Sequence, residues 1–289
     1  MNFKDINFKS PIFKLLVGMK FFLLLYFLTT INSAFSQEKA NIAPEGNNTV
    51  NIQVGNTAII PVTKLENDNY DWWNRHAEVL QIKDSINPEI VLIGNSITHF
   101  WGGEPKLKNA DGTLRNPNGP QAWNSAFGTH RVLNLGFGWD RIQNVLWRLN
   151  NGELDGIHPR LVIIHVGTNN TSETKNARRN TAPEIVEGIS EVYKKVHLKV
   201  PEAKIVVMAI MPMEQFPDHP RRQLINETNR LLKIYAQEQN ITVVDIGPKM
   251  LTPDGILSKD ITSDFCHPTE KGYQIWANAI RPFVNELEK

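Results

Sequence analysis

Five short runs of apolar residues constrain the fold of this chain more than any other feature of its sequence. The runs are rich in β-branched residues, are apolar on both faces, and occupy residues 90–93, 132–135, 161–166, 205–211 and 241–246. Short runs without polar alternation are typical of parallel strands whose two faces are both covered by other elements. The sequence therefore predicts a five-stranded parallel sheet.

The segments between these runs show the spacing of amphipathic helices. In three of them the apolar residues are spaced so that they share one face of a helix: Ile185, Ile189, Val192 and Val196; Leu224, Leu231, Leu232 and Tyr235; Trp276, Ile280, Phe283 and Leu287. A further helix is expected over residues 71–83. Alternation of strands and helices implies right-handed crossovers. We therefore expect an α/β fold, a three-layer α/β/α sandwich.

The first part of the chain has the pattern of a secretory signal peptide. Four lysines precede or flank a short apolar core at residues 21–28, and Ala34 and Ser36 supply small residues at the cleavage-determining positions. A membrane-spanning helix needs about 20 apolar residues. We therefore expect cleavage, export and no stable membrane anchor. The predicted organisation is a signal peptide (1–36), an extended lead-in (37–65) and one folded domain (66–289).

Charge and cysteine content exclude several classes of function. Removal of residues 1–36 takes away four lysines and one aspartate, which changes the formal net charge from +1 to −2. A near-neutral chain gives no electrostatic argument for binding nucleic acid. The one cysteine, Cys266, has no partner for an internal disulfide and is expected to pack as a small apolar residue. The sequence shows no metal-ligand spacing and no nucleotide-binding glycine motif, so we expect neither a metal nor a cofactor.

Polar residues follow the predicted strands, and ligands of open α/β sheets bind beyond the carboxyl ends of the strands. Ser96 follows the first strand, and Asp264 and His267 come after the last one. A serine needs a base to become a nucleophile, and histidine side chains titrate near neutrality. A carboxylate behind the imidazole fixes its tautomer. This set indicates a hydrolase in which Ser96 attacks, His267 transfers the proton and Asp264 orients the ring.

A tetrahedral intermediate also needs hydrogen-bond donors aimed at its oxyanion. The backbone amides of Ser96 and Gly136 and the side-chain amide of Asn169 are three candidates at successive strand ends. Each of these residues alone is more typical of a turn or a helix cap than of an active site, so it is the combination that favours catalysis. Thr98 stands where a Gly-x-Ser-x-Gly elbow would have its second glycine, which argues against an ordinary α/β-hydrolase.

Four segments together resemble the catalytic blocks of the SGNH, or GDSL-type, esterase and acylhydrolase superfamily. They are Gly94-Asn95-Ser96-Ile97, Asn134-Leu135-Gly136, Gly167-Thr168-Asn169-Asn170 and Asp264-Phe265-Cys266-His267. Residues 132–170 are similar to the catalytic subunits of the intracellular platelet-activating-factor acetylhydrolases. The resemblance implies a flavodoxin-like fold. It also implies Ser96, Asp264 and His267 as catalytic residues, with Gly136 and Asn169 in the oxyanion hole.

The substrate pocket is less constrained by the sequence. Asn95 stands where the family has Asp, and Trp139 follows the second block, where relatives have small residues. With Trp101 and Trp123, these two residues form the candidate pocket, and the aperiodic segment 102–130 is expected to form one of its walls. Indole faces stack on sugars, although three tryptophans are also typical of a core.

We expect an exported serine esterase that removes short acyl groups, above all acetyl, from O-acetylated carbohydrate. The similarity to the platelet-activating-factor enzymes leaves a lipid acetylhydrolase or lysophospholipase as the alternative within enzymes. A non-catalytic glycan-binding protein of the same fold is the alternative from another class.

Overall fold

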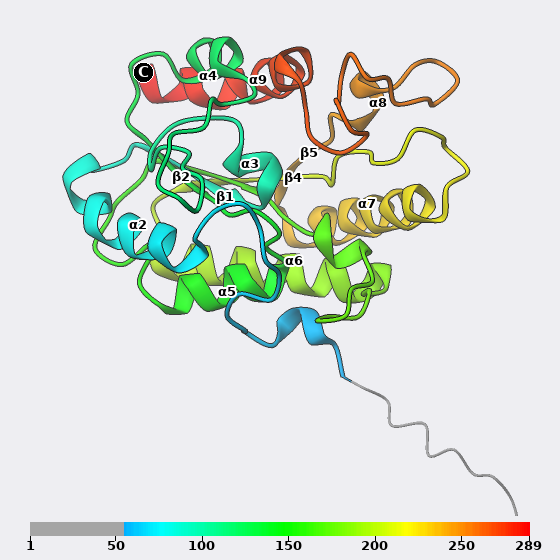
Figure 1. Ribbon diagram of the computed structural model, residues 1–289, viewed down its shortest axis with the longest axis horizontal. Helices are drawn as coiled ribbons and strands as arrows, with labels where there is room; N and C mark the ends of the chain where they lie inside the picture. Colours follow the sequence, from blue (N-terminus) through cyan, green and yellow to red (C-terminus); the bar gives the residue numbers. More distant parts are fainter. Residues whose placement is uncertain (1–54) are drawn as a thin grey trace, which may run out of the picture. The chain divides into compact units, whose positions relative to one another are not determined.

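The computed structural model describes residues 55–289, and the predicted signal peptide and residues 37–54 of the lead-in lie outside them (Figure 1). The strands are β1 (Ile90–Gly94), β2 (Val132–Gly136), β3 (Leu161–His165), β4 (Lys204–Met208) and β5 (Thr242–Val244). The helices are α2 (Trp72–Ile86), α3 (Ser96–His99), α4 (Pro120–Phe127), α5 (Ile142–Asn150), α6 (Ala182–Lys199), α7 (Pro220–Gln239), α8 (Gly247–Met250) and α9 (Glu270–Asn285). Three 3-10 turns complete the set: η1 (Thr57–Ile59), η2 (Asn169–Thr171) and η3 (Glu286–Glu288).

The five strands form one parallel sheet in the order β2-β1-β3-β4-β5. The predicted α/β class and the five-stranded parallel sheet are confirmed. The register aligns the carboxyl ends of the adjacent strands β2, β1 and β3, since Gly94 pairs with both Gly136 and His165. The residues that follow β1, β2 and β3 therefore lie side by side at the carboxyl end of the sheet.

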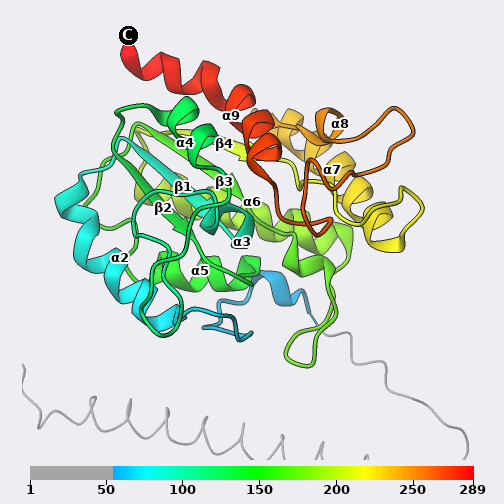
Figure 2. The ribbon, with the colours of Figure 1, turned by 45° about the horizontal axis from the view of Figure 1, so that its top comes forward.

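The strands are mainly apolar because each face of the sheet packs against its own layer of helices. Val91 and Ile93 belong to the core on the side of α5 and α6, whereas Ile90 and Leu92 belong to the core on the side of α4 and α9. Figure 1 and Figure 2 show these two layers on opposite sides of the sheet. Successive side chains of a strand point to opposite faces, so both faces require apolar residues.

The folded part of the chain begins earlier than the predicted boundary at residue 66. Ala58 in η1 is fully buried, and η1 packs against α5 and α6. Asn56 donates a hydrogen bond to the Glu184 carbonyl at 3.0 Å, and the Val62 amide donates to the Gln143 carbonyl at 3.1 Å. Within residues 55–65, these contacts attach the predicted extended lead-in to the folded domain, where η1 covers parts of α5 and α6.

The segment 102–130, expected to lack regular structure, contains α4. Pro120 occupies the first turn of this helix, where its missing N–H costs nothing. Trp123 and Phe127 lie one turn apart and pack together, with ring centroids 4.6 Å apart. The helix rests on α9, so this part of the segment builds core. None of the helices within residues 55–289 is long and apolar enough to span a bilayer.

Candidate active site

Ser96 lies at the start of α3, immediately beyond β1. The Asn95 side chain caps this helix, because its Oδ1 accepts a hydrogen bond from the Ile97 amide at 3.0 Å. The Tyr273 hydroxyl of α9 donates to the Ile97 carbonyl at 2.7 Å, which fixes the turn from the other side. Asn95 is fully buried. It therefore shapes the turn that presents Ser96 and does not line the substrate pocket, contrary to the sequence-based expectation.

The three residues predicted to act together converge at this point. Ser96 Oγ lies 2.9 Å from His267 Nε2, and His267 Nδ1 lies 2.7 Å from Asp264 Oδ2. The second carboxylate oxygen of Asp264 accepts hydrogen bonds from the amides of Cys266 at 3.0 Å and His267 at 2.7 Å. A carboxylate at Nδ1 favours the tautomer with its proton on that nitrogen, which leaves Nε2 free to accept the serine proton.

Two titratable groups next to this constellation have shifted pKa values. Partial burial would raise the pKa of Asp264, but hydrogen bonds from the His267 side chain and backbone outweigh it and hold that pKa below its usual value. Burial raises the pKa of Cys266 to about 12. Since the thiolate is the nucleophilic form of cysteine, the Cys266 side chain is inert near neutral pH and acts by packing.

In the turn after β2, the amide that is available to an oxyanion differs from the predicted one. The Gly136 amide donates to the Asn134 side chain at 2.8 Å and is not free for a ligand. A side chain at Gly136 would clash with the backbone of α3, so this glycine serves the close approach of two segments. The geometry contradicts the expectation that Gly136 donates to the oxyanion.

The backbone N–H of Trp139, a residue that lines the pocket at Ser96, is the candidate that replaces Gly136. The amides of Phe137, Gly138 and Asp140 all have acceptors, at 3.2, 3.3 and 3.2 Å. Within residues 55–289, nothing accepts a hydrogen bond from the Trp139 amide. Trp139 has a left-handed φ of 62°. Strained backbone of this kind clusters at functional sites.

Asn169 in η2 supplies the third predicted donor. One hydrogen of its side-chain amide goes to the Asp140 carbonyl at 2.9 Å. The second is left for a ligand, because Asn169 lines the same pocket as Ser96 and Trp139. The amides of Ser96 and Trp139 and the Nδ2 of Asn169 thus form the candidate oxyanion hole.

The pocket at Ser96 has a volume of about 260 Å³. Its walls are Asp68, Ser96, Phe100, Trp139, Asn169, Met213, Arg221, Cys266 and His267. A second hollow of about 440 Å³ shares Asp68, Phe100 and His267 with it. Arg115 also lines this hollow, and its guanidinium lies 3.8 Å from the Phe100 ring centroid. Sequence reasoning missed Asp68, Phe100, Met213 and Arg221, since nothing in their spacing relates them to the strand ends.

Only one of the three predicted pocket tryptophans lies in the pocket. Trp139 lines it and is 41% exposed. Trp101 is fully buried and stacks on Trp276 at 4.5 Å, and Trp123 packs edge-on against Trp101 at 5.8 Å. The assignment of Trp101 and Trp123 to the substrate pocket is wrong. Both indoles fill the core between α4 and α9.

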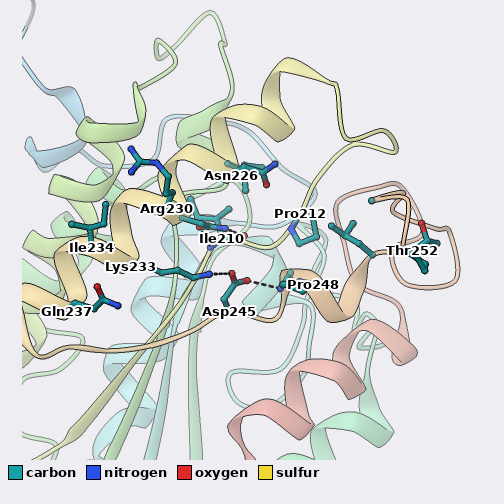
Figure 3. Close-up of a pocket in the computed structure, with 16 residues that line it drawn as sticks. Ile210, Pro212, Asn226, Arg230, Lys233, Ile234, Gln237, Asp245, Pro248 and Thr252 are labelled. Atoms are coloured by element: carbon teal, nitrogen blue, oxygen red, sulfur yellow. Dashed lines mark hydrogen bonds and ion pairs between the residues drawn. The ribbon is translucent and has the colours of Figure 1, made fainter.

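A larger groove of about 860 Å³ lies elsewhere, between α7 and the segment around α8 (Figure 3). Lys233 and Asp245 form an ion pair of 2.8 Å across it. The groove contains none of the predicted site residues and no histidine or serine. Its lining offers no activated nucleophile, so size alone does not identify the reactive site. Among residues 55–289, no group of His, Cys, Asp and Glu side chains is arranged to hold a metal ion.

A parallel sheet with a serine, a histidine and a carboxylate converging at its edge is the architecture of an ester hydrolase. The family model described as GDSL-like Lipase/Acylhydrolase matches residues 92–275. The chain is 31% identical over 218 residues to platelet-activating factor acetylhydrolase IB subunit alpha2 of Homo sapiens, which covers 75% of this chain and 84% of that protein. It is 29% identical to the human alpha1 subunit over 228 residues, or 78% and 88% of the two chains.

Solved structures agree with this assignment at the level of the fold. A putative acylhydrolase from Bacteroides fragilis gives a TM-score of 0.57 at 23% identity, covering 78% of this chain and all (100%) of that one. Axe2, an acetylxylan esterase from Geobacillus stearothermophilus, gives a TM-score of 0.52 at 20% identity, with coverages of 68% and 94%. The chain therefore belongs to the GDSL-like lipase/acylhydrolase family, and it is a carboxylic ester hydrolase.

Proposed function

We propose that this chain removes short acyl groups, acetyl above all, from O-acetylated carbohydrate through an acyl-enzyme on Ser96. The observation that carries the proposal is the pair of short contacts that joins Ser96 Oγ to His267 and His267 to Asp264. An alcohol so placed can lose its proton to the imidazole as it attacks an acyl carbon.

The reaction proceeds in two steps. In the first, the Ser96 proton passes to His267 Nε2, Oγ bonds to the acyl carbon, and the carbonyl oxygen becomes an oxyanion facing the amides of Ser96, Trp139 and Asn169. The intermediate collapses, the C–O bond to the alcohol breaks, and His267 returns the proton to the departing oxygen. In the second step, water repeats the sequence and releases the acid from Ser96.

The size and lining of the pocket support a short acyl group on a carbohydrate. About 260 Å³ bounded by Phe100, Met213 and Cys266 suits an acetyl group better than a fatty acyl chain. The half-exposed indole of Trp139 offers a face for a sugar ring. Axe2, whose fold this chain shares, is an acetylxylan esterase.

The N-terminal pattern supports action outside the cytoplasm. A cleaved signal peptide at residues 1–36 would deliver the domain to the periplasm or the medium, where acetylated glycans are accessible. Detection of a mature protein that starts near residue 37 in the exported fraction is the expected result. Retention of the full chain in the cytoplasm would contradict export without affecting the chemistry.

A panel of esters tests the substrate class. Acetate release is measured from acetylated xylan, O-acetylated sialate, 4-nitrophenyl acetate and a 2-acetyl phospholipid, beside a Ser96→Ala control. We expect turnover of the aryl acetate and of at least one glycan, and none by the Ser96→Ala protein. A fluorophosphonate probe is expected to label Ser96, whereas a non-catalytic glycan-binding protein would stay unlabelled.

A lipid acetylhydrolase is the second candidate, because platelet-activating factor acetylhydrolase IB subunit alpha2 is 31% identical over 75% of this chain. In that case the 2-acetyl phospholipid is hydrolysed and the glycans are not. That outcome would replace the carbohydrate while leaving the roles of Ser96, His267 and Asp264 unchanged.

A further inference from the structure

We infer that Asp140 is a positioning residue for the oxyanion hole, which it holds through a buried network of charges between α2 and α5. The inference rests on the proposed function, since it concerns the donors of that site. Asp140 follows Trp139 directly and contacts Asn169, so it joins two of the three candidate donors.

The side chain and the backbone of Asp140 make different contacts. Its carboxylate is buried, with a side-chain exposure of 2%, and accepts hydrogen bonds from Trp72 Nε1 at 2.7 Å and Arg148 Nε at 2.8 Å. Its backbone carbonyl accepts the hydrogen bond from Asn169 Nδ2 at 2.9 Å. A displacement of the Asp140 carboxylate therefore displaces the carbonyl that orients Asn169 and the peptide that carries the Trp139 amide.

Arg148 extends this network away from the site. It pairs with the buried Glu153 and donates to the Leu135 carbonyl at 3.2 Å. Glu153 Oε1 lies 2.8 Å from Nδ1 of the buried His76. Each charge thus has a partner, as buried charges require.

A second buried arginine and a tyrosine fix the same turn. Arg75 donates to the carbonyls of Asn134 at 3.0 Å and Gly136 at 2.9 Å, and the Tyr70 hydroxyl donates to the Gly138 carbonyl at 3.1 Å. The carbonyls of residues 134, 135, 136, 138 and 140 therefore all accept hydrogen bonds from side chains. Side chains thus fix most of the backbone carbonyls of this turn. Among the amides of residues 136–140, that of Trp139 is the one without an acceptor within residues 55–289.

Stability alone does not account for such an arrangement. Apolar residues of similar volume commonly stabilise a core as well as a buried ion pair does. What they lack is directional contact with a backbone, and the left-handed conformation of Trp139 needs surroundings that enforce it. Burial raises the pKa of Asp140 to about 6, although Arg148 and Trp72 oppose this, so the carboxylate is charged at neutral pH.

Catalysis is sensitive to small displacements of this kind. A misplacement of about 1 Å at a catalytic group can cost about a hundredfold in rate. Loss of the Asp140 charge leaves Arg148 with Glu153 as its remaining carboxylate partner and loosens the peptide whose carbonyl orients Asn169. Binding of the substrate in its ground state is affected less, because the oxyanion develops only in the transition state and the tetrahedral intermediate.

A double-variant cycle tests the inference. kcat and KM are measured on 4-nitrophenyl acetate for the wild type, Asp140→Asn, Asn169→Ala and the double variant. We expect Asn169→Ala to lower kcat by about a hundredfold. Asp140→Asn should lower kcat by about tenfold or more, with KM within about twofold of the wild type. The loss of kcat in the double variant should be smaller than the product of the two single losses, because part of the effect of Asp140→Asn acts through Asn169, while the part that acts through the Trp139 amide remains.

The milder variant Trp72→Phe keeps an aromatic side chain and removes one hydrogen bond to Asp140. It provides a second test if Asp140→Asn folds poorly. We expect a threefold to tenfold loss of kcat from Trp72→Phe in the wild type, again with little change in KM, and a smaller loss in the Asn169→Ala background. The inference would be overturned if, in both double variants, the loss of kcat equalled the product of the losses in the two single variants.

A matched control separates positioning from general loosening. Val196 is fully buried in the last turns of α6, at the opposite end of that helix from η2, so Val196→Ala weakens the fold without touching the network. Its kcat should equal that of the wild type under conditions where both are folded. An equal loss of kcat in Val196→Ala and Asp140→Asn would contradict a positioning role. An inactive wild type would instead refute the proposed function.

Discussion

The two sides of the candidate site are built in opposite ways. On one side, Ser96, Trp139 and Asn169 emerge from strand ends and are held by buried side chains of other elements. On the other side, Asp264 and His267 lie on the loop before α9 and mainly hold each other. The contrast is visible in exposure, since the Asp140 side chain is 2% exposed and that of Asp264 is 53% exposed.

This difference follows from what each side must do. Donors that stabilise an oxyanion act as fixed dipoles, and their contribution depends on not having to reorganise during the reaction. The acid-base residue moves a proton between three oxygen atoms and needs the correct tautomer more than a rigid backbone. Substitutions on the buried side should therefore lower both activity and stability, whereas substitutions on the exposed side should lower activity with little effect on stability.

The sharpest test of that separation is His267→Ala. Removal of the base should lower kcat by about 10⁴-fold or more. The pair with Asp264 is partly exposed, and such pairs contribute about 1 kcal/mol or less to folding. Urea denaturation should therefore give a nearly unchanged free energy of unfolding. A large loss of stability would show that the loop before α9 is as strongly coupled to the core as the strand ends are.

Arg148→Leu tests the buried side. The substitution leaves Asp140 and Glu153 without their common partner, and breaking one partner of a buried pair costs about 3–5 kcal/mol of unfolding free energy. The loss should shrink as the pH falls toward 5, because a buried carboxylate with a raised pKa becomes neutral there. A loss below about 1 kcal/mol at neutral pH would remove the difference between the two sides.

The sequence was informative where the chemistry depends on residue type at a strand end. Ser96 and Asn169 were found because the carboxyl ends of parallel strands meet at one end of the sheet. Asp264 and His267 were found because a carboxylate three residues before a histidine suits an acid-base pair. The oxyanion amide was misplaced, because any residue has a backbone N–H and only the turn decides which one is free. Asn134 and Gly136 are two residues apart, a spacing at which an Asn side chain often caps a following amide, and that was the missed signal.

The tryptophans illustrate a second limit. Trp123 and Phe127 lie four residues apart, the spacing of neighbours on one helix face, so core packing was readable in the sequence. Arg148 lies on a helix otherwise buried through Ile142, Val145 and Leu149. Its partner Asp140 precedes that helix and Glu153 follows it, so only the fold shows that the three charges compensate one another.

The pH dependence of stability should also originate on the buried side. His165 at the end of β3 is fully buried, and burial lowers its pKa from 6.5 to about 4. Since the unfolded chain binds this proton more readily, stability is lost as the pH falls from about 6.5 to about 4, by up to about 3 kcal/mol. His165→Leu should flatten this part of the stability profile in urea titrations, and an unchanged slope would assign the acid sensitivity to other groups.

The smallest expected effect separates the backbone of Trp139 from its side chain, at the point where the two sides face the substrate. Glycine accepts the left-handed conformation without strain, so Trp139→Gly should raise stability by about 1 kcal/mol while keeping the N–H. Turnover of 4-nitrophenyl acetate should stay within about threefold of the wild type, because that small ester needs only the amide. An indole–sugar contact is worth about 1 kcal/mol, so KM for an acetylated glycan should rise about fivefold to tenfold.

Trp139→Ala is the matched control, since it lacks the indole but keeps the strained φ. Its KM for the acetylated glycan should equal that of the glycine variant, but it should not show the gain in stability. Equal KM values for all three proteins would remove the sugar contact, and a hundredfold loss of kcat in Trp139→Gly would show that the rigid side depends on the side chain as well as on the buried network.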